Sequence, residues 1–471
     1  MFNVQKHVEE YTLKIMFISL GCDKNLVDTE YMLGILKDKG FEFTDDEMEA
    51  EVIVINTCCF IHDAKQESIN TIIEMAEHKQ DACCKALIVS GCLAQRYQDE
   101  ILKELPEVDA IIGTSSYDKI AEVVLSKLCE KDLLSENNLL LSDPLPFYKN
   151  NVLENVNRLV EVSSDRIITT GGYYEYLKIA EGCDKHCTYC IIPKIRGSYR
   201  SYPMEYLIKE AQLLAQNGVK ELILVAQETT MYGVDLYGEK SLSKLLYKLS
   251  AIDGIEWIRI LYCYPEEIDK ELITAIKNIP KVVKYLDMPI QHASDTILKK
   301  MGRRTSKQEL IAIIDQLREE IPDIALRTTL ITGFPGETKE EHEELLDFVN
   351  DMEFDRLGVF TYSAEEDTPA ANMKNQISET VKEERRDEIM ALQQEISLDK
   401  SSQLIGTVLS CIVEGKMIDD DVYVTRSYKD APNVDGYVFI HTDENLLSGD
   451  MVKVKIESAY EYDLMGSLVH E

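Results

Sequence analysis

Three cysteines stand close together in the stretch GCDKHCTYCIIPKIRG, with the spacing C-x3-C-x2-C. They are Cys183, Cys187 and Cys190, and the next cysteine along the chain is Cys263. A structural zinc site needs four ligands. His186 is the nearest candidate for a fourth, but it adjoins Cys187, so both side chains would struggle to reach one metal. An iron–sulfur cubane is normally held by four thiolates, and three would leave one iron open to an outside ligand. The plain alternative, three buried structural cysteines, is disfavoured because clustered thiols in a cytosolic chain usually bind or react.

Three strand-like segments near the N-terminus each end in a cysteine. KIMFISLGC, EVIVINTC and KALIVSGC are apolar runs that end at Cys22, Cys58 and Cys92. A helical pattern follows each run, which predicts a doubly wound parallel α/β sheet. Ligand sites form at the edge where the carboxyl ends of parallel strands meet. We therefore expect these three cysteines to converge on a second site.

The charge and the cysteine content limit the kind of protein this can be. The chain has 471 residues, of which 50 are basic and 85 acidic, so its formal net charge is −35. Such a surface repels polyanions and suits a basic partner. The first residues, MFNVQKHVEEYTLK, have no signal-peptide pattern, and the apolar runs are too short to cross a bilayer. We expect a cytoplasmic protein without membrane contact, in which thiols stay reduced and cysteines serve metal or redox chemistry.

The pattern of strands and helices predicts three domains and a linker. The doubly wound α/β domain at 13–130 is followed by a linker at 131–168 that is rich in Asn, Ser and Pro. Six strand patterns within 169–401, the first five each followed by a helix, predict a partial (βα)6 barrel. The Cys183–Cys190 loop follows the first of these strands, at the face where barrel enzymes place their chemistry. Short alternating strands at 402–471 predict a small β-barrel.

The cysteine motif, with Tyr189 before its last cysteine, resembles the signature of the radical S-adenosylmethionine (SAM) superfamily. The resemblance implies a 4Fe-4S cluster on Cys183, Cys187 and Cys190, whose open iron binds the methionine part of SAM. It also implies that one electron from the cluster releases a deoxyadenosyl radical, which removes hydrogen from unactivated carbon. Tyr189 is then expected beside the cofactor. The partial barrel is the fold that this superfamily implies.

Two further segments resemble SAM-binding segments of that superfamily. VAQETT, at the end of the second barrel strand, implies that Gln227 and Glu228 contact the amino group of SAM. ITGFPGET, at the end of the fifth strand, implies that Thr332 and Gly333 lie along the adenosyl part. Arg327 on the same strand could pair with the SAM carboxylate. ITGFPGET also fits a Gly-Pro turn before a helix capped by its final threonine, and structural roles for Glu228 and Arg327 are left open.

The order of the three domains resembles that of the methylthiotransferases, over nearly the whole chain. The segments SLGCDKNLVDTE, INTCCFIHDAKQES and IVSGCLAQRY imply that Cys22, Cys58 and Cys92 hold a second 4Fe-4S cluster, which presents sulfur to the substrate. Cys59 stands where a small residue is expected and could compete with Cys58, although its side chain should leave the strand end in the opposite direction. The other cysteines are interpreted as ordinary thiols: Cys83, Cys84, Cys129, Cys263 and Cys411.

The C-terminal β-barrel resembles the TRAM domain, which often binds RNA. Residues 402–471 contain five basic and thirteen acidic side chains, a poor composition for binding phosphate, although this acidity also fits a general role in solubility. RSYKDAPNVDG and VAQETTMYG resemble segments of the branch that modifies a ribosomal protein. That branch implies a methylthio group added to the β-carbon of an aspartate in ribosomal protein uS12. The alternative is the branch that modifies an adenosine derivative in transfer RNA.

The resemblance implies a reaction in two halves. One SAM methylates sulfur at the N-terminal cluster, and a second SAM, at the Cys183–Cys190 loop, generates the radical that activates the aspartate carbon. We expect the two open irons to face one cavity, and an electron donor such as flavodoxin or ferredoxin. A rival from another class is an iron–sulfur scaffold protein that does not cleave SAM.

Overall fold

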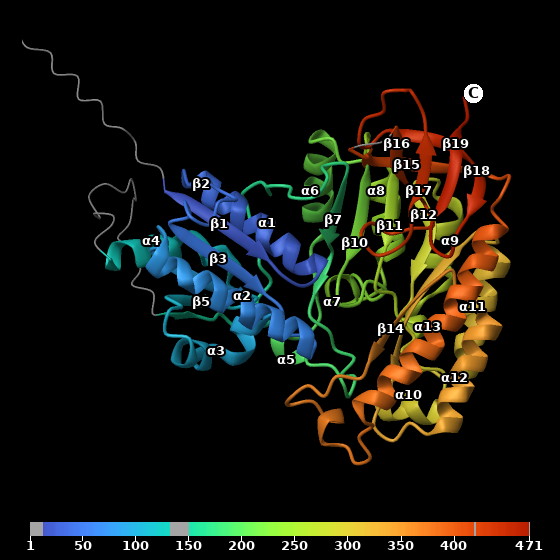
Figure 1. Cartoon of the computed structure of the whole chain (residues 1–471), viewed down its shortest axis with the longest axis horizontal. Helices are drawn as coiled ribbons and strands as arrows, with labels where there is room; N and C mark the ends of the chain where they lie inside the picture. Colours follow the sequence, from blue (N-terminus) through green and yellow to red (C-terminus); the bar gives the residue numbers. More distant parts are fainter. Residues whose placement is uncertain (1–12, 132–149, 419–420, 471) are drawn as a thin grey trace, which may run out of the picture. The chain divides into compact units, whose positions relative to one another are not determined.

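The computed structural model describes residues 13–131, 150–418 and 421–470, which fold as two compact units (Figure 1). Of the described residues, those up to 168 and those at 192–197 form the first unit, and those at 169–191 and from 198 onward form the second. The short segment 192–197 lies inside the predicted barrel domain, yet it packs with the N-terminal unit. Among the described helices, none is both long and apolar enough to cross a membrane.

The first unit is built on a parallel sheet that has six strands in the described residues, in the order β2-β1-β3-β4-β5-β6. Helices α1 and α4 contact each other, whereas α2 and α3 pack on the central strands. Strands β3 and β4 are buried along their whole length because both of their faces are covered. The elements are β1 (Lys14–Ser19), α1 (Asp23–Asp38), β2 (Glu42–Phe43), β3 (Val52–Thr57), α2 (His62–Asp81), β4 (Ala86–Gly91), α3 (Cys92–Glu104), β5 (Ala110–Ile112), the 3-10 turn η1 (Tyr117–Lys119), α4 (Ile120–Glu130), β6 (Asn151–Val152) and α5 (Ile192–Arg196).

The predicted doubly wound sheet is confirmed, and the structure adds three short strands to the three that the sequence indicated. Strands β2, β5 and β6 were not predicted, because two or three residues are too few to show a periodic pattern. The predicted linker 131–168 lies partly outside the described residues, at 132–149. Its later part belongs to the first unit, where β6 pairs with β5 and Arg166 forms a buried ion pair with Glu30.

The second unit contains an open parallel sheet that curves into a partial barrel, with six strands in the order β14-β13-β12-β11-β10-β7 over residues 174–361. All six predicted strands are present, so the partial barrel is confirmed. Its elements are β7 (Tyr174–Lys178), β8 (Ala180–Glu181), β9 (Arg200–Ser201), α6 (Met204–Gln216), β10 (Glu221–Val225), α7 (Val234–Tyr237), α8 (Leu242–Ser250), β11 (Trp257–Ile260), η3 (Pro265–Glu267), α9 (Lys270–Asn278), β12 (Val282–Asp287), α10 (Asp295–Met301), α11 (Lys307–Glu320), β13 (Ala325–Thr332), α12 (Lys339–Met352), β14 (Arg356–Thr361), η4 (Ala370–Asn372) and α13 (Glu379–Ser402).

Helix α12 begins with a capping box, as ITGFPGET suggested. The Thr338 side chain accepts a hydrogen bond from the Glu341 backbone N–H at 3.2 Å, and the Glu341 carboxylate accepts one from the Thr338 N–H at 2.8 Å. Two of the N–H groups that a helix leaves unpaired are thereby satisfied. The segment thus fixes where the fifth barrel strand ends and its helix starts.

The C-terminal domain is a closed barrel in the order β15-β16-β17-β19-β18 over the described residues (Figure 1). Four of its strands were predicted, and the fifth, which contains LMGSL, was missed because it lacks a clear alternation of polar and apolar residues. The strands are β15 (Val408–Lys416), β16 (Val422–Ser427), β17 (Val438–His441), β18 (Met451–Ala459) and β19 (Leu464–Leu468).

The C-terminal barrel closes the amino end of the partial barrel. Its residues Ile412 and Ala431 join the apolar core that Ile223, Tyr285 and Ala325 form inside the partial barrel. The Cys183–Cys190 loop lies at the other end of these strands, their carboxyl end, which the described residues of the C-terminal barrel do not cover.

Candidate metal centres and cofactor site

The three N-terminal cysteines come together at the carboxyl edge of the first sheet, as the strand pattern predicted. Cys22 is the N-cap of α1, Cys92 is the first residue of α3, and Cys58 follows β3 directly. The Ser68 hydroxyl accepts a hydrogen bond from the Cys58 N–H at 3.0 Å and donates one to the Cys58 carbonyl at 2.9 Å. That pair of bonds fixes the backbone of the central cysteine.

Two glycines make room for this convergence. Gly21 and Gly91 precede Cys22 and Cys92, with φ angles of 93° and 90° that disfavour other residues. A Cβ on Gly21 would lie 2.6 Å from the Cys58 Cβ, and one on Gly91 would lie 2.3 Å from the Asn56 Oδ1. The Gly-Cys pairs in SLGC and SGC therefore have a steric reason.

The environment of these cysteines suits metal binding better than isolated thiols. Burial raises the pKa of Cys58, and it raises the pKa of Cys92 well above its ordinary value. One feature acts the other way: the Arg196 guanidinium lowers the pKa of Cys58 and of Cys92. A metal would supply the remaining stabilisation that buried thiolates require.

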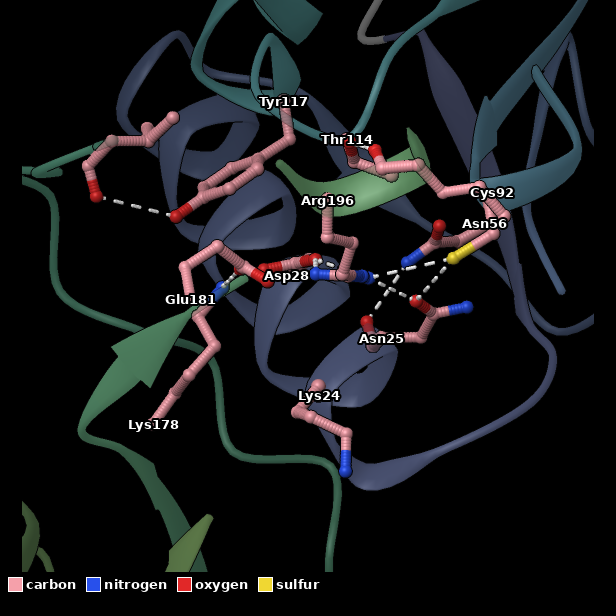
Figure 2. Close-up of polar contacts among 12 residues, drawn as sticks. Lys24, Asn25, Asp28, Asn56, Cys92, Thr114, Tyr117, Lys178, Glu181 and Arg196 are labelled. Carbon is pink, nitrogen blue, oxygen red and sulfur yellow. Dashed lines mark hydrogen bonds and ion pairs between the residues drawn. The ribbon is translucent and has the colours of Figure 1, made fainter. Parts of the chain in front are cut away.

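The Arg196 side chain is the charged partner of this site, and the sequence pattern did not identify it. It is 2% exposed and lies between Asn25, Asp28 and Cys92 (Figure 2). Its Nη2 lies 2.5 Å from the Asn25 Oδ1 and 3.8 Å from the Cys92 Sγ. Arg196 stands in the quoted cysteine stretch, but only the structure shows that its segment packs with the first unit.

The second cysteine trio lies in the loop after β7 and β8. Cys183 and Cys187 are 7% and 5% exposed, and Cys190 is half-buried, with its N–H donating to the Cys187 carbonyl at 3.0 Å. Burial raises the pKa of Cys183 to about 12. His186 has a φ of 52° and an exposed side chain.

Glu228 lies beside this loop, at the carboxyl end of β10. It is 2% exposed, accepts a hydrogen bond from the Thr230 hydroxyl at 3.2 Å and lies 3.4 Å from the Lys185 Nζ. Burial raises the pKa of Glu228 to about 7, although Lys185 lowers it. The neighbouring Gln227 donates to the Glu181 Oε1 at 3.0 Å, while its own Oε1 is buried without a hydrogen-bond partner among the described residues. An amino group bound here would supply the missing donor.

Three side chains around Cys187 were not predicted: Lys185, Tyr264 and Arg303. The Tyr264 hydroxyl lies 3.7 Å from the Cys187 Sγ, and the Arg303 guanidinium stacks on the Tyr264 ring at 4.2 Å. Arg303 is 6% exposed, and its Nε and Nη1 have no hydrogen-bond partner in the described part of the chain. Sequence spacing gave no signal for Tyr264 and Arg303, because they come from other strand–helix connections.

The remaining predicted SAM contacts have structural partners. The Thr332 hydroxyl donates to the Lys382 carbonyl at 3.2 Å, and a Cβ on Gly333 would lie 2.2 Å from the Lys382 Cγ, so both residues pack against α13. Tyr189 packs on an apolar cluster that includes Met301.

Arg327 is already paired with two carboxylates. Its Nη1 lies 3.2 Å from the Asp287 Oδ1, and its Nε lies 3.3 Å from the Asp435 Oδ1 in the C-terminal domain. It stands five residues before the end of β13, whereas Thr332 ends that strand. A SAM carboxylate would have to displace those partners, and the contacts of Arg327 favour the structural role that the sequence left open.

The donor sets fit cubane clusters better than a single metal ion. Within the described residues, no group of three or more His, Cys, Asp or Glu side chains is arranged to hold one ion. A cubane makes no such demand, because each thiolate binds a different iron. Each trio offers three soft ligands, and buried Cys59 is a further thiol beside the N-terminal trio.

Comparisons with known proteins define the class. Residues 14–113 match the model of the uncharacterized protein family UPF0004, residues 177–349 that of the radical SAM superfamily, and residues 405–469 that of the TRAM domain. The chain therefore has a radical SAM core, and that superfamily uses SAM and an iron–sulfur cluster.

Curated relatives define the family. The chain is 60% identical over 455 residues to the ribosomal protein uS12 methylthiotransferase RimO of Lachnoclostridium phytofermentans, covering 97% of this chain and 100% of the relative. It is 53% identical to the RimO of Acetivibrio thermocellus (97% and 99%) and 49% identical to that of Clostridioides difficile (98% and 99%). This chain belongs to the RimO family of methylthiotransferases.

Solved structures agree on the fold. The radical SAM methyltransferase TsrM of Kitasatospora setae superposes with a TM-score of 0.53 at 12% identity, over 82% of this chain and 89% of that one. The cobalamin-dependent SAM radical enzyme OxsB superposes with a TM-score of 0.51 at 15% identity, over 82% of this chain and 56% of that one. At such low identity the likeness concerns the fold alone.

Proposed function

We propose that this chain attaches a methylthio group to the β-carbon of an aspartate in ribosomal protein uS12. The observation that carries the proposal is the presence of two cysteine trios, each at the carboxyl edge of a parallel sheet, in a chain 49–60% identical to relatives named for this activity. One trio would hold the cluster that the radical SAM core requires. The other would hold a second 4Fe-4S cluster, which is part of the proposal.

The residues at the barrel mouth would bind one cluster and orient SAM. Cys183, Cys187 and Cys190 would each hold one iron, and Glu228 and Gln227 would accept hydrogen bonds from the amino group of SAM. When bound, SAM and the clusters supply a radical that removes hydrogen from carbon and a sulfur that replaces it. Cys183 and Cys187 are buried, so the irons that they would hold are shielded from water on the protein side.

The residues of the first unit would hold the cluster that presents sulfur to the substrate. Cys22, Cys58 and Cys92 would each hold one iron of the second cluster. Ser68 and the two glycines fix the backbone that carries them. Cys59 is fully buried. That it could compete with Cys58 as a ligand stays a prediction.

Charge supports a protein substrate over transfer RNA. Phosphate binding depends on exposed Lys and Arg side chains, and three of the five basic residues in the C-terminal domain are paired with carboxylates: Arg426 with Glu221 and Glu414, Lys416 with Asp421, and Lys429 with Asp355. Lys453 and Lys455 stay exposed on β18. The net charge of −35 favours encounter with a basic protein, and ribosomal proteins are usually basic.

The setting of the reaction follows from its substrate. A ribosomal protein substrate places the proposed reaction in the cytoplasm. The proposed electron donor is a small redox protein such as flavodoxin or ferredoxin.

The test supplies both substrates to the same enzyme. Anaerobically reconstituted protein is incubated with SAM and dithionite, and with either uS12 or transfer RNA, and each product is measured by mass spectrometry. The proposal expects the mass shift of one methylthio group on a uS12 peptide that contains the aspartate, and none on the RNA. A shift on the RNA alone would replace the proposal with the transfer-RNA activity. Release of no deoxyadenosine would favour the scaffold alternative.

A further inference from the structure

The Arg196 guanidinium lies buried among the residues that position the N-terminal cysteines. Arg196 ends α5, and Figure 2 shows its side chain pointing at the start of α1 and at Cys92. Its Nη1 and Nη2 both lie 3.2 Å from the Asp28 Oδ2, and Nη2 also contacts Asn25 and the Cys92 Sγ. An arginine remains protonated at any physiological pH, so this charge is permanent.

Asn25 connects that charge to the other two cysteines. Its Nδ2 donates to the Leu20 carbonyl at 2.9 Å, two residues before Cys22, and to the Thr57 carbonyl at 3.0 Å, directly before Cys58. Its Oδ1 is the atom that Arg196 binds, and it also lies 3.8 Å from the Cys92 Sγ. The Arg196–Asn25 pair therefore contacts the backbone next to Cys22 and Cys58 and the side chain of Cys92.

The helix that carries Arg196 is itself anchored in the first unit. The Thr114 hydroxyl donates to the Ile195 carbonyl at 2.8 Å, one residue before Arg196. Thr114 is 6% exposed, so the bond is shielded from water. The side-chain contacts of Arg196 and the Thr114 hydrogen bond to its helix together fix the position of the guanidinium.

We propose that Arg196 is a positioning residue of the N-terminal cluster, which orients Asn25 and Cys92 and makes the cluster easier to reduce. The inference rests on the second cluster of the proposed function. Hydrogen bonds to the ligating sulfurs and nearby charge set the potential of an iron–sulfur cluster. A fixed positive charge stabilises the form with one more electron, and Asp28 offsets part of that effect.

The test isolates one cluster in the full-length chain. Replacing Cys183, Cys187 and Cys190 by alanine gives a parent variant in which the N-terminal cluster is the one remaining iron–sulfur centre. Arg196→Met, Arg196→Lys or Asp28→Asn is then added, the protein is reconstituted anaerobically with iron and sulfide, and the midpoint potential is measured by electron paramagnetic resonance during a redox titration. Iron per chain is counted in parallel.

The two neutralising changes should move the potential in opposite directions. Arg196→Met removes the positive charge, so the ratio of reduced to oxidised cluster at a fixed potential should fall by about tenfold, which corresponds to about 59 mV for one electron. Asp28→Asn removes the opposing charge and should raise that ratio. Arg196→Lys keeps the charge and should stay close to the parent.

Arg158→Met is the matched control. Arg158 forms a bidentate pair with Asp118 in the same unit, at 2.7 and 2.6 Å, without a contact to the cysteines in the described hydrogen bonds. Its loss should leave the potential unchanged, whereas an equal shift would show a general charge effect and overturn the proposal.

Each remaining outcome supports or overturns the proposed role of Arg196. Parent potentials in both Arg196→Met and Asp28→Asn would overturn the role of Arg196 and leave the second cluster intact. If Arg196→Met does not fold, Asp28→Asn decides alone, and the absence of a positive shift overturns the proposal. If the parent variant binds no iron, the second cluster itself is refuted, and the role of Arg196 falls with it.

Discussion

Arg426 of the C-terminal barrel and Glu221 of β10 form an ion pair in which both side chains are fully buried. Arg259 also binds Glu221, with its Nε 2.7 Å from the Oε1, and Arg426 reaches Glu414 at 2.7 Å. Burial alone would raise the pKa of Glu221, but the two arginines hold it below its ordinary value. The network ties the TRAM domain to the amino end of the partial barrel, opposite the cysteine loop.

Breaking this pair should destabilise the second unit strongly. Arg426→Met leaves the Glu221 carboxylate buried with one partner fewer, and removal of one member of a buried pair costs about 3–5 kcal/mol. Denaturant unfolding would measure the loss. Lys416→Met, which breaks the exposed pair with Asp421, is the control and should leave the free energy of unfolding unchanged within error. Equal stability of Arg426→Met and wild type would show that the network does not hold the domains together.

SAM binding should depend on pH through Glu228. Its pKa is raised to about 7 by burial, so the carboxylate that is proposed to accept a hydrogen bond from the SAM amino group predominates only above that pH. A hydrogen bond to a charged acceptor is worth about 1.5–3 kcal/mol, and we expect SAM affinity to rise by about tenfold from pH 6 to pH 8. Equilibrium dialysis with Glu228→Gln should give a flatter profile, which separates this effect from the ionisation of SAM itself.

The same raised pKa gives the sign of a stability effect. Between the ordinary pKa of a glutamate, about 4.3, and 7, the folded protein binds the Glu228 proton more tightly than the unfolded chain does. Ionising Glu228 therefore lowers stability as the pH rises through that window. Without SAM, Glu228→Gln should be at least as stable as wild type at pH 8. A clear loss of stability there would mean that Lys185 and Thr230 stabilise the carboxylate more than burial opposes it.

Gly21 should be required for the cluster on Cys22, Cys58 and Cys92 and dispensable for the cluster at the barrel. In Gly21→Ala the new Cβ would meet the Cys58 side chain at 2.6 Å, which displaces a ligand. We expect iron per chain to fall by about half, while SAM cleavage at the barrel persists. Gly40→Ala is the matched control, because Gly40 has a similar φ of 85° but no atom within 4 Å of the new Cβ. A similar loss of iron in both variants would point to backbone strain and not to the ligand.

Much of the fold follows from the sequence because its strands are long and continuous. VIVINT and ALIVSG are buried along their length in the structure, as runs in a parallel sheet must be. The cysteines at their ends could be placed on one edge for the same reason. Strands of two residues, such as β2 and β6, have no pattern to detect and depend on their neighbours.

The contacts of single charged residues could not be predicted in the same way. Arg196 and Arg303 reach their sites through tertiary packing, and their spacing in sequence has no regular relation to the residues they touch. The DAP and DG residues of RSYKDAPNVDG show the same limit. Asp430 pairs with Arg356, and Asp435 pairs with Arg327, so a segment noted for its family resemblance holds the TRAM domain on the barrel.

This chain is proposed to carry two incompletely ligated iron–sulfur cubanes, and a count of iron and sulfide in anaerobically prepared protein is the direct test. Wild type should contain about eight irons per chain. The count should fall to about four when Cys22, Cys58 and Cys92 are replaced by alanine, and to about four when Cys183, Cys187 and Cys190 are replaced. About four irons in wild type, or zinc in place of iron, would contradict the presence of two clusters.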